Sequence, residues 1–359
     1  MVGIDVASYR VPSMSEINSL PLNGRVVASF FSGCGGSSLG YRMAGFRVGY
    51  ANEFIPSARE TYRSNFPSTE IDERDIRTVD PAEVLSKLGL APGELDILDG
   101  SPPCASFSTN GIVEDGWGRV KIYSDTKQRV DDLFYEYIRM VDAIRPRVFV
   151  AENVSGLVKG KAKGVFLNVL ERLKGCGGGY EVKVKLLDAS YLGVPQARQR
   201  LIFIGVRSDL QLGPVFPKPL AVRYSLRDAL SNMTKNHVER ETDMSRYEIS
   251  RYVKKIELFG ISEKRFNLCR PRLDRPCPTV VTKFGDPSAA SVFHPFEDRK
   301  FSIDELRRIC GFPEDFILCG SFKKQAERLG RAVPPVLMSH VAMTLLREVF
   351  GRMTEGRGR

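Results

Sequence analysis

The chain has 359 residues, of which 42% are hydrophobic and 27% are charged, an ordinary composition for a globular protein with a large buried core. Its formal net charge of +10 suggests a polyanionic partner, and no apolar run approaches the length of a membrane span. Seven cysteines without a C-x-x-C pair and three scattered histidines support neither a disulfide framework nor a zinc site, so no metal is expected. Residues 1 to 23 are an N-terminal extension without the pattern of a signal peptide, and we expect a cytoplasmic protein.

The first part of the chain, residues 24 to 207, alternates short apolar runs with helical patterns. This alternation predicts an α/β fold with a doubly wound, mainly parallel sheet that helices cover on both faces. The expected strands are 26–30, 47–51, 95–98, 148–151, 182–186 and 201–204, with a helix at 133–144.

The pattern changes after Arg207, where glycine and several prolines mark a linker. From residue 208 to residue 325 the helical and strand signals are short and mixed, which indicates a second, smaller domain. Residues 105 to 128 carry three glycines, polar residues and Trp117, a composition that suits a mobile lid after Cys104.

Three polar segments suggest chemistry on a nucleobase. Two prolines precede Cys104 and limit the freedom of its loop, which suits a thiolate that adds to C6 of a cytosine. Glu152 ends an apolar strand, where burial would raise its pKa and let it carry a proton for N3 of the base. Arg198 and Arg200, two residues apart on an extended segment, would hold the base and the acid.

Each of these segments also has an ordinary explanation. A lone cysteine is more often an inert buried side chain than a nucleophile, and a Gln-x-Arg-x-Arg run is often a solvated charge run. The glycines at 33, 35 and 36 lie between a strand and a helix, and Glu53 follows about twenty residues later. This spacing fits any nucleoside cofactor, including a dinucleotide.

Taken together and in order, these segments resemble the DNA cytosine-C5 methyltransferase family over roughly residues 24 to 345. The segments that resemble the family's first, second, third, fourth, sixth, eighth, ninth and tenth motifs are Phe30–Gly36, Asn52–Phe54, Asp75–Ile76, Pro102–Cys104, Glu152–Val154, Gln196–Arg200, Arg275–Thr279 and Gly330–Pro335.

The resemblance implies a class I methyltransferase-like, Rossmann-related fold that uses S-adenosylmethionine. It assigns residues 24–207 plus 326–359 to the catalytic domain and 208–325 to a target-recognition domain. The implied reaction is methyl transfer to C5 of a flipped-out cytosine in a specific double-stranded DNA sequence, through a covalent adduct of Cys104. Catalysis would involve Cys104, Glu152, Asn153, Arg198 and Arg200. The implied cofactor-binding residues are Phe31, Ser32, Gly33, Cys34, Gly35, Gly36, Asn52, Glu53, Phe54, Asp75, Ile76, Ser101, Pro103, Arg331, Ala332 and Val333.

The remaining partners follow from the same resemblance. We expect a monomer that associates with the nucleoid when it is on DNA, and a cognate restriction endonuclease stays open as a partner. From Arg240 to Arg275 basic residues outnumber acidic ones and aromatic residues lie among them, which favours phosphate contact, although a solvated helical face would look the same. The residues expected to contact DNA are Lys254, Lys255, Arg270, Arg272, Arg275 and Thr279.

Three departures from the family pattern leave alternatives open. Ser29 stands where the family usually has an acid, Ala105 stands where an amide is common, and Arg331 replaces the usual asparagine. An arginine at 331 needs an anion, either a DNA phosphate or the carboxylate of carboxy-S-adenosylmethionine, which would give 5-carboxymethylcytosine. An RNA cytosine-C5 methyltransferase is a further alternative, and a non-catalytic DNA-binding relative would require the loss of Cys104 or Glu152, both of which are present.

Overall fold

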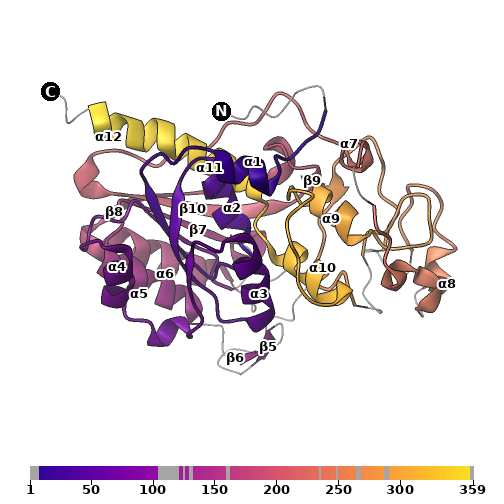
Figure 1. The fold of residues 1–359 in the computed structure, drawn as a ribbon, viewed down its shortest axis with the longest axis horizontal. Coiled ribbons are helices and arrows are strands. Elements are labelled where there is room, and N and C mark those ends of the chain that lie inside the picture. Colours follow the sequence, from indigo (N-terminus) through magenta and orange to yellow (C-terminus); the bar gives the residue numbers. More distant parts are fainter. Residues whose placement is uncertain are drawn as a thin grey trace. The chain divides into compact units, whose positions relative to one another are not determined.

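The structure is a computed structural model in which the chain forms two compact units (Figure 1). We call Leu20–Leu187, Gln199–Pro217 and Met338–Arg359 the sheet unit, and Met1–Ser19, Asp188–Arg198 and Lys218–Leu337 the small unit. The described residues are 8–103, 121–123, 126–128, 132–158, 162–233, 236–247, 250–263, 268–286 and 291–355.

A seven-stranded sheet is the centre of the sheet unit, with the order β3-β2-β1-β4-β7-β10-β8 (Figure 1). Five neighbouring strands from β3 to β7 are parallel, and β10 runs antiparallel to β7. The doubly wound, mainly parallel sheet predicted from the sequence is therefore present, including its final strand pair. The strands are β1 (Val26–Phe30), β2 (Arg47–Asn52), β3 (Glu70–Asp72), β4 (Ile97–Gly100), β7 (Val148–Val154), β8 (Tyr180–Asp188) and β10 (Gln199–Arg207).

Helix α5 (Leu133–Ile144) shows how the sheet is covered. Its apolar side chains recur at helical spacing and are buried against the strands. Tyr137 lies over the sheet, where its hydroxyl donates to the carbonyls of Leu98 and Val150. Gly100 permits this close approach, because a Cβ there would lie 2.4 Å from the Tyr137 ring. The other described helices of this unit are α2 (Gly36–Met43), α3 (Pro56–Asn65), α4 (Pro81–Leu88), α6 (Ala162–Gly175) and α12 (Gly351–Glu355). Shorter helical turns are η1 (Ile76–Thr78), η2 (Ser155–Val158), η3 (Cys176–Gly178), η5 (Ser208–Leu210) and η8 (Leu346–Phe350). A separate hairpin consists of β5 (Lys121–Tyr123) and β6 (Thr126–Gln128).

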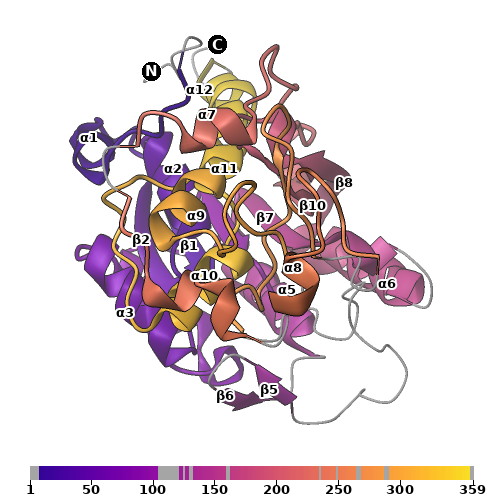
Figure 2. The same ribbon diagram turned by 90° about the vertical axis from the view of Figure 1, so that its right-hand side faces the viewer.

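The small unit is built from short elements, several of which are labelled in Figure 2. Helix α9 begins with a capping box, in which Ser302 and Glu305 each bond to the other's backbone N–H. A separate apolar core is formed by Met244, Val253, Ile256, Leu268 and Phe293. The described elements are α1 (Met14–Ser19), η4 (Ala189–Tyr191), β9 (Gln196–Ala197), α7 (Leu226–Leu230), η6 (Arg240–Thr242), η7 (Met244–Arg246), α8 (Ser250–Val253), β11 (Cys277–Pro278), α9 (Ile303–Ile309) and α10 (Phe322–Arg331), and α11 (Pro335–Leu345) continues into the sheet unit.

The unit boundaries differ from the predicted domain boundaries in four segments. Residues 1–19, 188–198 and 326–337 group with the small unit, and residues 208–217 group with the sheet unit. Residues 188–198 group with the small unit because of strand pairing. Their strand β9 pairs in parallel with β11, with Gln196 opposite Cys277. The functional division into a catalytic and a target-recognition domain stays a prediction.

The stretch Phe322–Met353, which contains α10, α11, η8 and the start of α12, is long and apolar enough to span a membrane by length and composition. The sequence alone predicts no such span. However, 72% of the most apolar window in this stretch is buried inside the protein, and buried core helices pass the same test.

Candidate functional site

The turn after β1 is shaped by residues with left-handed backbone. Phe31 has a φ of 53°, Gly33 of 58° and Gly35 of 95°. Glycine is required at position 35, because a Cβ there would lie 2.3 Å from the Phe66 ring, whereas the space beside the Cα of Gly33 is open. Ser32 is buried and its hydroxyl donates to the carbonyl of Ser29. The turn therefore presents backbone N–H groups at the start of α2, as a nucleoside cofactor requires.

Glu53 is fixed beside this turn. Its two carboxylate oxygens accept from the backbone N–H groups of Gly33 and Ile55, each at 2.7 Å, and the side chain is buried. The carboxylate is held at the carboxyl end of β2, next to the glycine turn, where a ligand hydroxyl could donate to it. Phe54, the next residue, is half-buried, and its carbonyl accepts from Arg59.

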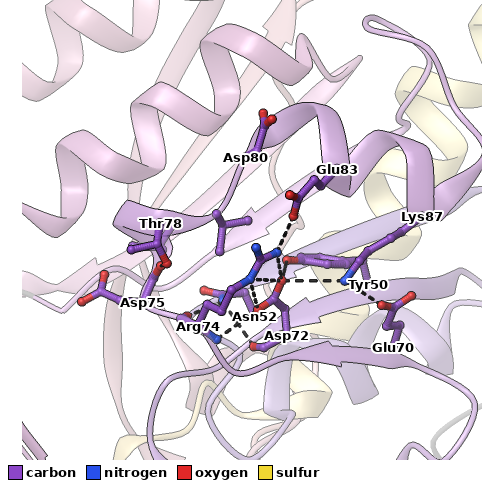
Figure 3. Close-up of polar contacts among 12 residues, drawn as sticks. Tyr50, Asn52, Glu70, Asp72, Arg74, Asp75, Thr78, Asp80, Glu83 and Lys87 are labelled. Atoms are coloured by element: carbon purple, nitrogen blue, oxygen red, sulfur yellow. Dashed lines mark hydrogen bonds and ion pairs between the residues drawn. The ribbon is translucent and has the colours of Figure 1, made fainter.

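A polar network positions the segment that follows β3 (Figure 3). Asn52 donates to the backbone carbonyls of Asp72 and Arg74, at 3.2 and 2.9 Å. Asp72 accepts from Tyr50 and pairs with Arg74 at 2.7 Å. Burial alone would raise the pKa of Asp72, but the hydrogen bonds from Arg74 and Tyr50 dominate and lower it to about 2. Asn52 thus holds the backbone that leads into Asp75 and Ile76, which are predicted to bind the cofactor.

Asp75 and Ile76 come directly after this network. Asp75 caps the short turn η1 by accepting from the N–H of Arg77, and it also pairs with the Arg77 guanidinium at 2.8 Å. Ile76 is buried. These are the contacts of a capping residue and a core residue, and a role of either in cofactor binding stays a prediction.

The Pro-Pro segment is tied to the neighbouring strands. The N–H of Ser101 donates to the carbonyl of Phe30 at 3.3 Å, and the Asn153 side-chain amide donates to the carbonyl of Pro102 at 3.2 Å. This contact is the one expected if Asn153 braces the loop. Cys104 itself, like most of the predicted lid, lies outside the described residues.

Glu152 and Arg200 form an ion pair on adjoining strands. Arg200 Nε lies 2.6 Å from Glu152 Oε1, and both side chains are almost fully buried. The antiparallel register of β10 and β7 places Ile202 opposite Glu152, so Arg200 is two residues along the same strand face. Burial lowers the pKa of Arg200, whereas Glu152 opposes this shift by stabilising the guanidinium charge.

Arg198 belongs to the small unit and has different partners. It is fully buried, and its guanidinium donates to the carbonyls of Val280 and Gly330, at 3.2 and 2.7 Å. Thr279 donates to the carbonyl of Ala197 at 2.7 Å. Both side chains therefore stabilise the backbone of the small unit, while the predicted contacts of Arg198 with the base and of Thr279 with DNA stay predictions.

The predicted cofactor residues of the tenth motif lie at the end of α10 in the small unit. Arg331 Nε lies 2.8 Å from Glu327 Oε1, one helical turn earlier. Ala332 is the residue at which α10 ends, and Val333 is buried.

The predicted DNA-contacting residues fall into two groups. Lys254, Lys255 and Arg275 are exposed, as is Arg272, which pairs with Asp274. Arg270 is buried, and its guanidinium donates to the carbonyls of Ile256, His294 and Glu297 and pairs with Asp298. The Arg270 side chain holds two loops of the small unit together, because burying a guanidinium requires such partners, and its contact with DNA stays a prediction.

One titratable residue escaped the sequence analysis. Asp99 lies in the middle of the apolar strand β4, with 2% of its surface exposed. An acid that interrupts a buried strand run was the available signal, because such a group is seldom buried without a purpose. The expected strand at 95–98 ended one residue short of it.

Comparisons with known proteins agree with this geometry. The model of the C-5 cytosine-specific DNA methylase family matches residues 26–347. The chain is 32% identical over 339 residues to the Type II methyltransferase M1.HphI of Haemophilus parahaemolyticus, covering 88% of this chain and 85% of the relative. It is also 32% identical to the Type II methyltransferase M.Sau96I of Staphylococcus aureus, covering 94% and 80%. A solved structure of a DNMT2 variant from Spodoptera frugiperda has the same fold, with a TM-score of 0.65, 18% identity, and coverage of 91% and 100%.

Proposed function

As a member of the C-5 cytosine-specific DNA methylase family, this chain is a DNA (cytosine-5-)-methyltransferase, and we propose that it acts through a covalent adduct between Cys104 and C6 of a flipped-out cytosine. The observation that carries this proposal is the buried ion pair of Glu152 and Arg200. It lies on the strand whose next residue, Asn153, holds the segment that leads to Cys104.

The chain's residues divide the work as follows. Cys104 Sγ, as a thiolate, forms a bond to C6, and the electron pair moves through the ring to N3, which takes a proton from the carboxyl of Glu152. That carboxyl must first bind a proton from solvent, because its ion pair with Arg200 favours the ionised form. Arg200 holds the carboxyl of Glu152 in place through its Nε. C5 would take the methyl group from the sulfonium of the bound cofactor, which would be left as a neutral thioether. Loss of the C5 proton to a base, return of the N3 proton to Glu152 and cleavage of the Sγ–C6 bond would then restore the ring and the thiolate. C6 is out of reach inside the base stack, so the cytosine must be flipped out of the duplex.

The family implies S-adenosylmethionine as the methyl donor, and the residues of the sheet unit fit it. The turn at Gly33 has open space beside its Cα, as close approach of a ligand requires. Glu53 offers a fixed carboxylate for ribose hydroxyls, and Phe31 offers a half-buried aromatic ring for the adenine. When bound, this cofactor supplies an electrophilic methyl group.

Trapping on modified DNA tests the covalent step. Duplex DNA with 5-fluorocytosine at the target cannot lose its C5 substituent, so the wild-type protein with cofactor should form an adduct that survives denaturation. Cys104→Ala should form none, whereas Cys176→Ala, at a buried cysteine of η3 with no assigned role, should still form it. An adduct in Cys104→Ala would assign the nucleophile to another residue.

The carboxymethyl alternative loses its motivation in this structure. It required an anion for Arg331, and Glu327 already provides one at 2.8 Å. We therefore favour methyl transfer. Use of carboxy-S-adenosylmethionine by the wild type but not by Arg331→Asn, seen by weighing the modified nucleoside, would reverse this choice.

The relatives named Type II methyltransferases favour DNA over RNA as the substrate and fit a restriction-modification role. We propose duplex DNA of a specific sequence, read by a monomer in the cytoplasm, with a cognate endonuclease as the expected partner. Label transfer to duplex DNA and not to transfer RNA is the expected result.

A further inference from the structure

A buried carboxyl at the centre of the sheet has no role in the chemistry above. Asp99 accepts from the Ser29 hydroxyl at 3.1 Å and from the Tyr41 hydroxyl at 3.2 Å. Among the residues that the structure describes, no lysine or arginine pairs with it. A carboxylate that is ionised there has only two hydroxyl partners, which is poor compensation for burial.

The strand register explains where this carboxyl comes from. In the parallel pairing of β1 and β4, Ser29 lies directly opposite Asp99. Ser29 is the position at which the sequence departs from the family by lacking an acid. In this chain a carboxyl stands on the neighbouring strand, and it accepts a hydrogen bond from Ser29.

The site lies at the carboxyl ends of two central parallel strands. β1 ends at Phe30 and leads into the turn of Gly33 and Gly35, and β4 ends at Gly100, directly after Asp99. Ligands of open parallel sheets bind outside this edge. A cationic ligand there would interact with a carboxylate through the interior of the protein, where charges act more strongly than in water.

Burial is the main reason that the pKa of Asp99 is raised to about 7. Within that balance, the hydrogen bonds from Ser29 and Tyr41 lower the pKa, and the charge of Glu152 on β7 raises it. The other titratable groups that interact with it are Tyr62 of α3 and Tyr137 of α5. Burial raises the pKa of both tyrosines well above neutral, as it does for Tyr41, so all three are neutral near pH 7.

We propose that Asp99 is an electrostatic positioning residue for the cofactor: its carboxylate, supplied by β4 in place of an acid at position 29, favours binding of the cationic S-adenosylmethionine. This inference rests on the proposed function for the identity of the cofactor. Coupling between two binding events is reciprocal, so the bound cation must favour release of the Asp99 proton to solvent. Cofactor binding should therefore release a proton near pH 6 to 7 and should tighten as pH rises through this window.

Calorimetry on the free enzyme, without DNA, measures both effects. We would titrate S-adenosylmethionine into the protein at about pH 6 and about pH 7.5, in buffers with different ionisation enthalpies, to count released protons. The dissociation constant of the wild type should fall by about tenfold over this range, as expected for a shift of one pKa unit. The amino group of the cofactor titrates just above the window, so the slope of Asp99→Asn is the baseline.

Four comparisons sharpen the test. Asp99→Asn should bind more weakly at the higher pH and should lose the proton release. The exchange variant Ser29→Asp with Asp99→Ser returns the carboxyl to β1 and should restore tight binding. Tyr41→Phe removes a hydrogen bond that favours the ionised carboxyl, so the midpoint of the pH dependence should move to higher pH. S-adenosylhomocysteine, which lacks the sulfonium charge, should show a smaller dependence.

Equal slopes and equal proton release in the wild type and Asp99→Asn would overturn the proposal, as would a wild type that releases no proton. If Asp99→Asn does not fold, two other measurements test the proposal. They are the number of protons that the wild type releases on cofactor binding and the midpoint of the pH dependence of binding in Tyr41→Phe. Failure here leaves the trapping of 5-fluorocytosine by Cys104 unaffected, whereas absence of that trapping leaves this binding measurement standing.

Discussion

Two sets of charged side chains differ in how far solvent reaches them. At the carboxyl edge of the sheet, Glu53, Asp99 and Glu152 are buried, held by backbone N–H groups, by hydroxyl groups and by the Arg200 guanidinium, respectively. In the small unit, Lys254, Lys255 and Arg275, which are predicted to contact DNA, are exposed, whereas Arg198 and Arg270 of the same unit are buried. We therefore expect the chemistry to depend on groups placed within a rigid frame, and DNA contact to depend on charges that solvent can reach. Substitutions should therefore act on turnover in the first set and on salt-dependent binding in the second.

Glu152→Gln should cause the largest loss. It keeps the shape and a hydrogen-bond donor but removes the titratable acid, so turnover should fall by about a hundredfold or more while DNA binding persists. Single-turnover methylation and filter binding measure the two quantities. Glu181→Gln, at an exposed acid in β8 of the same unit, is the matched control. Unchanged turnover in Glu152→Gln would place the acid elsewhere.

Arg200→Lys should cause a smaller loss at the same site. Lysine keeps the charge but not the flat guanidinium whose Nε contacts Glu152, so turnover should fall by about tenfold. The thermal midpoint of unfolding would be followed in parallel, since a change in turnover without a change in folding separates positioning from stability. Arg207→Lys, further along β10 and paired with Asp209, is the control. Equal effects of the two substitutions would contradict a specific role of Arg200.

Neutralising Lys254 and Lys255 together should weaken the salt dependence of DNA binding. The slope of log K against log salt concentration should become less negative by roughly two, because about one counterion is released per phosphate contact. The preferred sequence should not change. Lys183→Gln with Lys185→Gln makes the same charge change on exposed residues of β8 in the sheet unit. If both pairs alter the slope equally, the effect is one of net charge and not of contact.

A further expected effect is on stability, and it depends on pH. The pKa of Asp99 in the folded protein, about 7, lies above the ordinary value of 3.8, so the folded state holds a proton that the unfolded chain has released. Stability is therefore lost as pH rises from about 4 to about 7. Asp99→Asn should leave the thermal midpoint unchanged near pH 4 and raise it near pH 8. A difference between the two proteins that does not vary with pH would contradict the assigned titration.

Strand residues were well predicted and contacts across the chain were not. The apolar runs around Val26 and Val148 predicted two strands of the sheet, because buried parallel strands are continuously apolar. The order of the motifs in the sequence assigned Glu152 and Arg200 to the predicted site. The spacing of the two arginines assigned the same role to Arg198. Its contacts with Val280 and Gly330 could not be predicted, because they depend on chain segments far away in sequence. Arg270 and Asp99 show the same limit, because burial of a charged residue follows from packing that no local pattern encodes.

The central claim is methyl transfer to cytosine C5 in DNA. The most direct measurement incubates the purified protein with duplex DNA and S-adenosylmethionine that carries an isotopically labelled methyl group, digests the DNA and weighs the nucleosides. Labelled 5-methyl-2′-deoxycytidine should form with the wild type and should be absent with Cys104→Ala. Label on the exocyclic amine of cytosine or on adenine, or no labelled nucleoside with any duplex sequence, would contradict it.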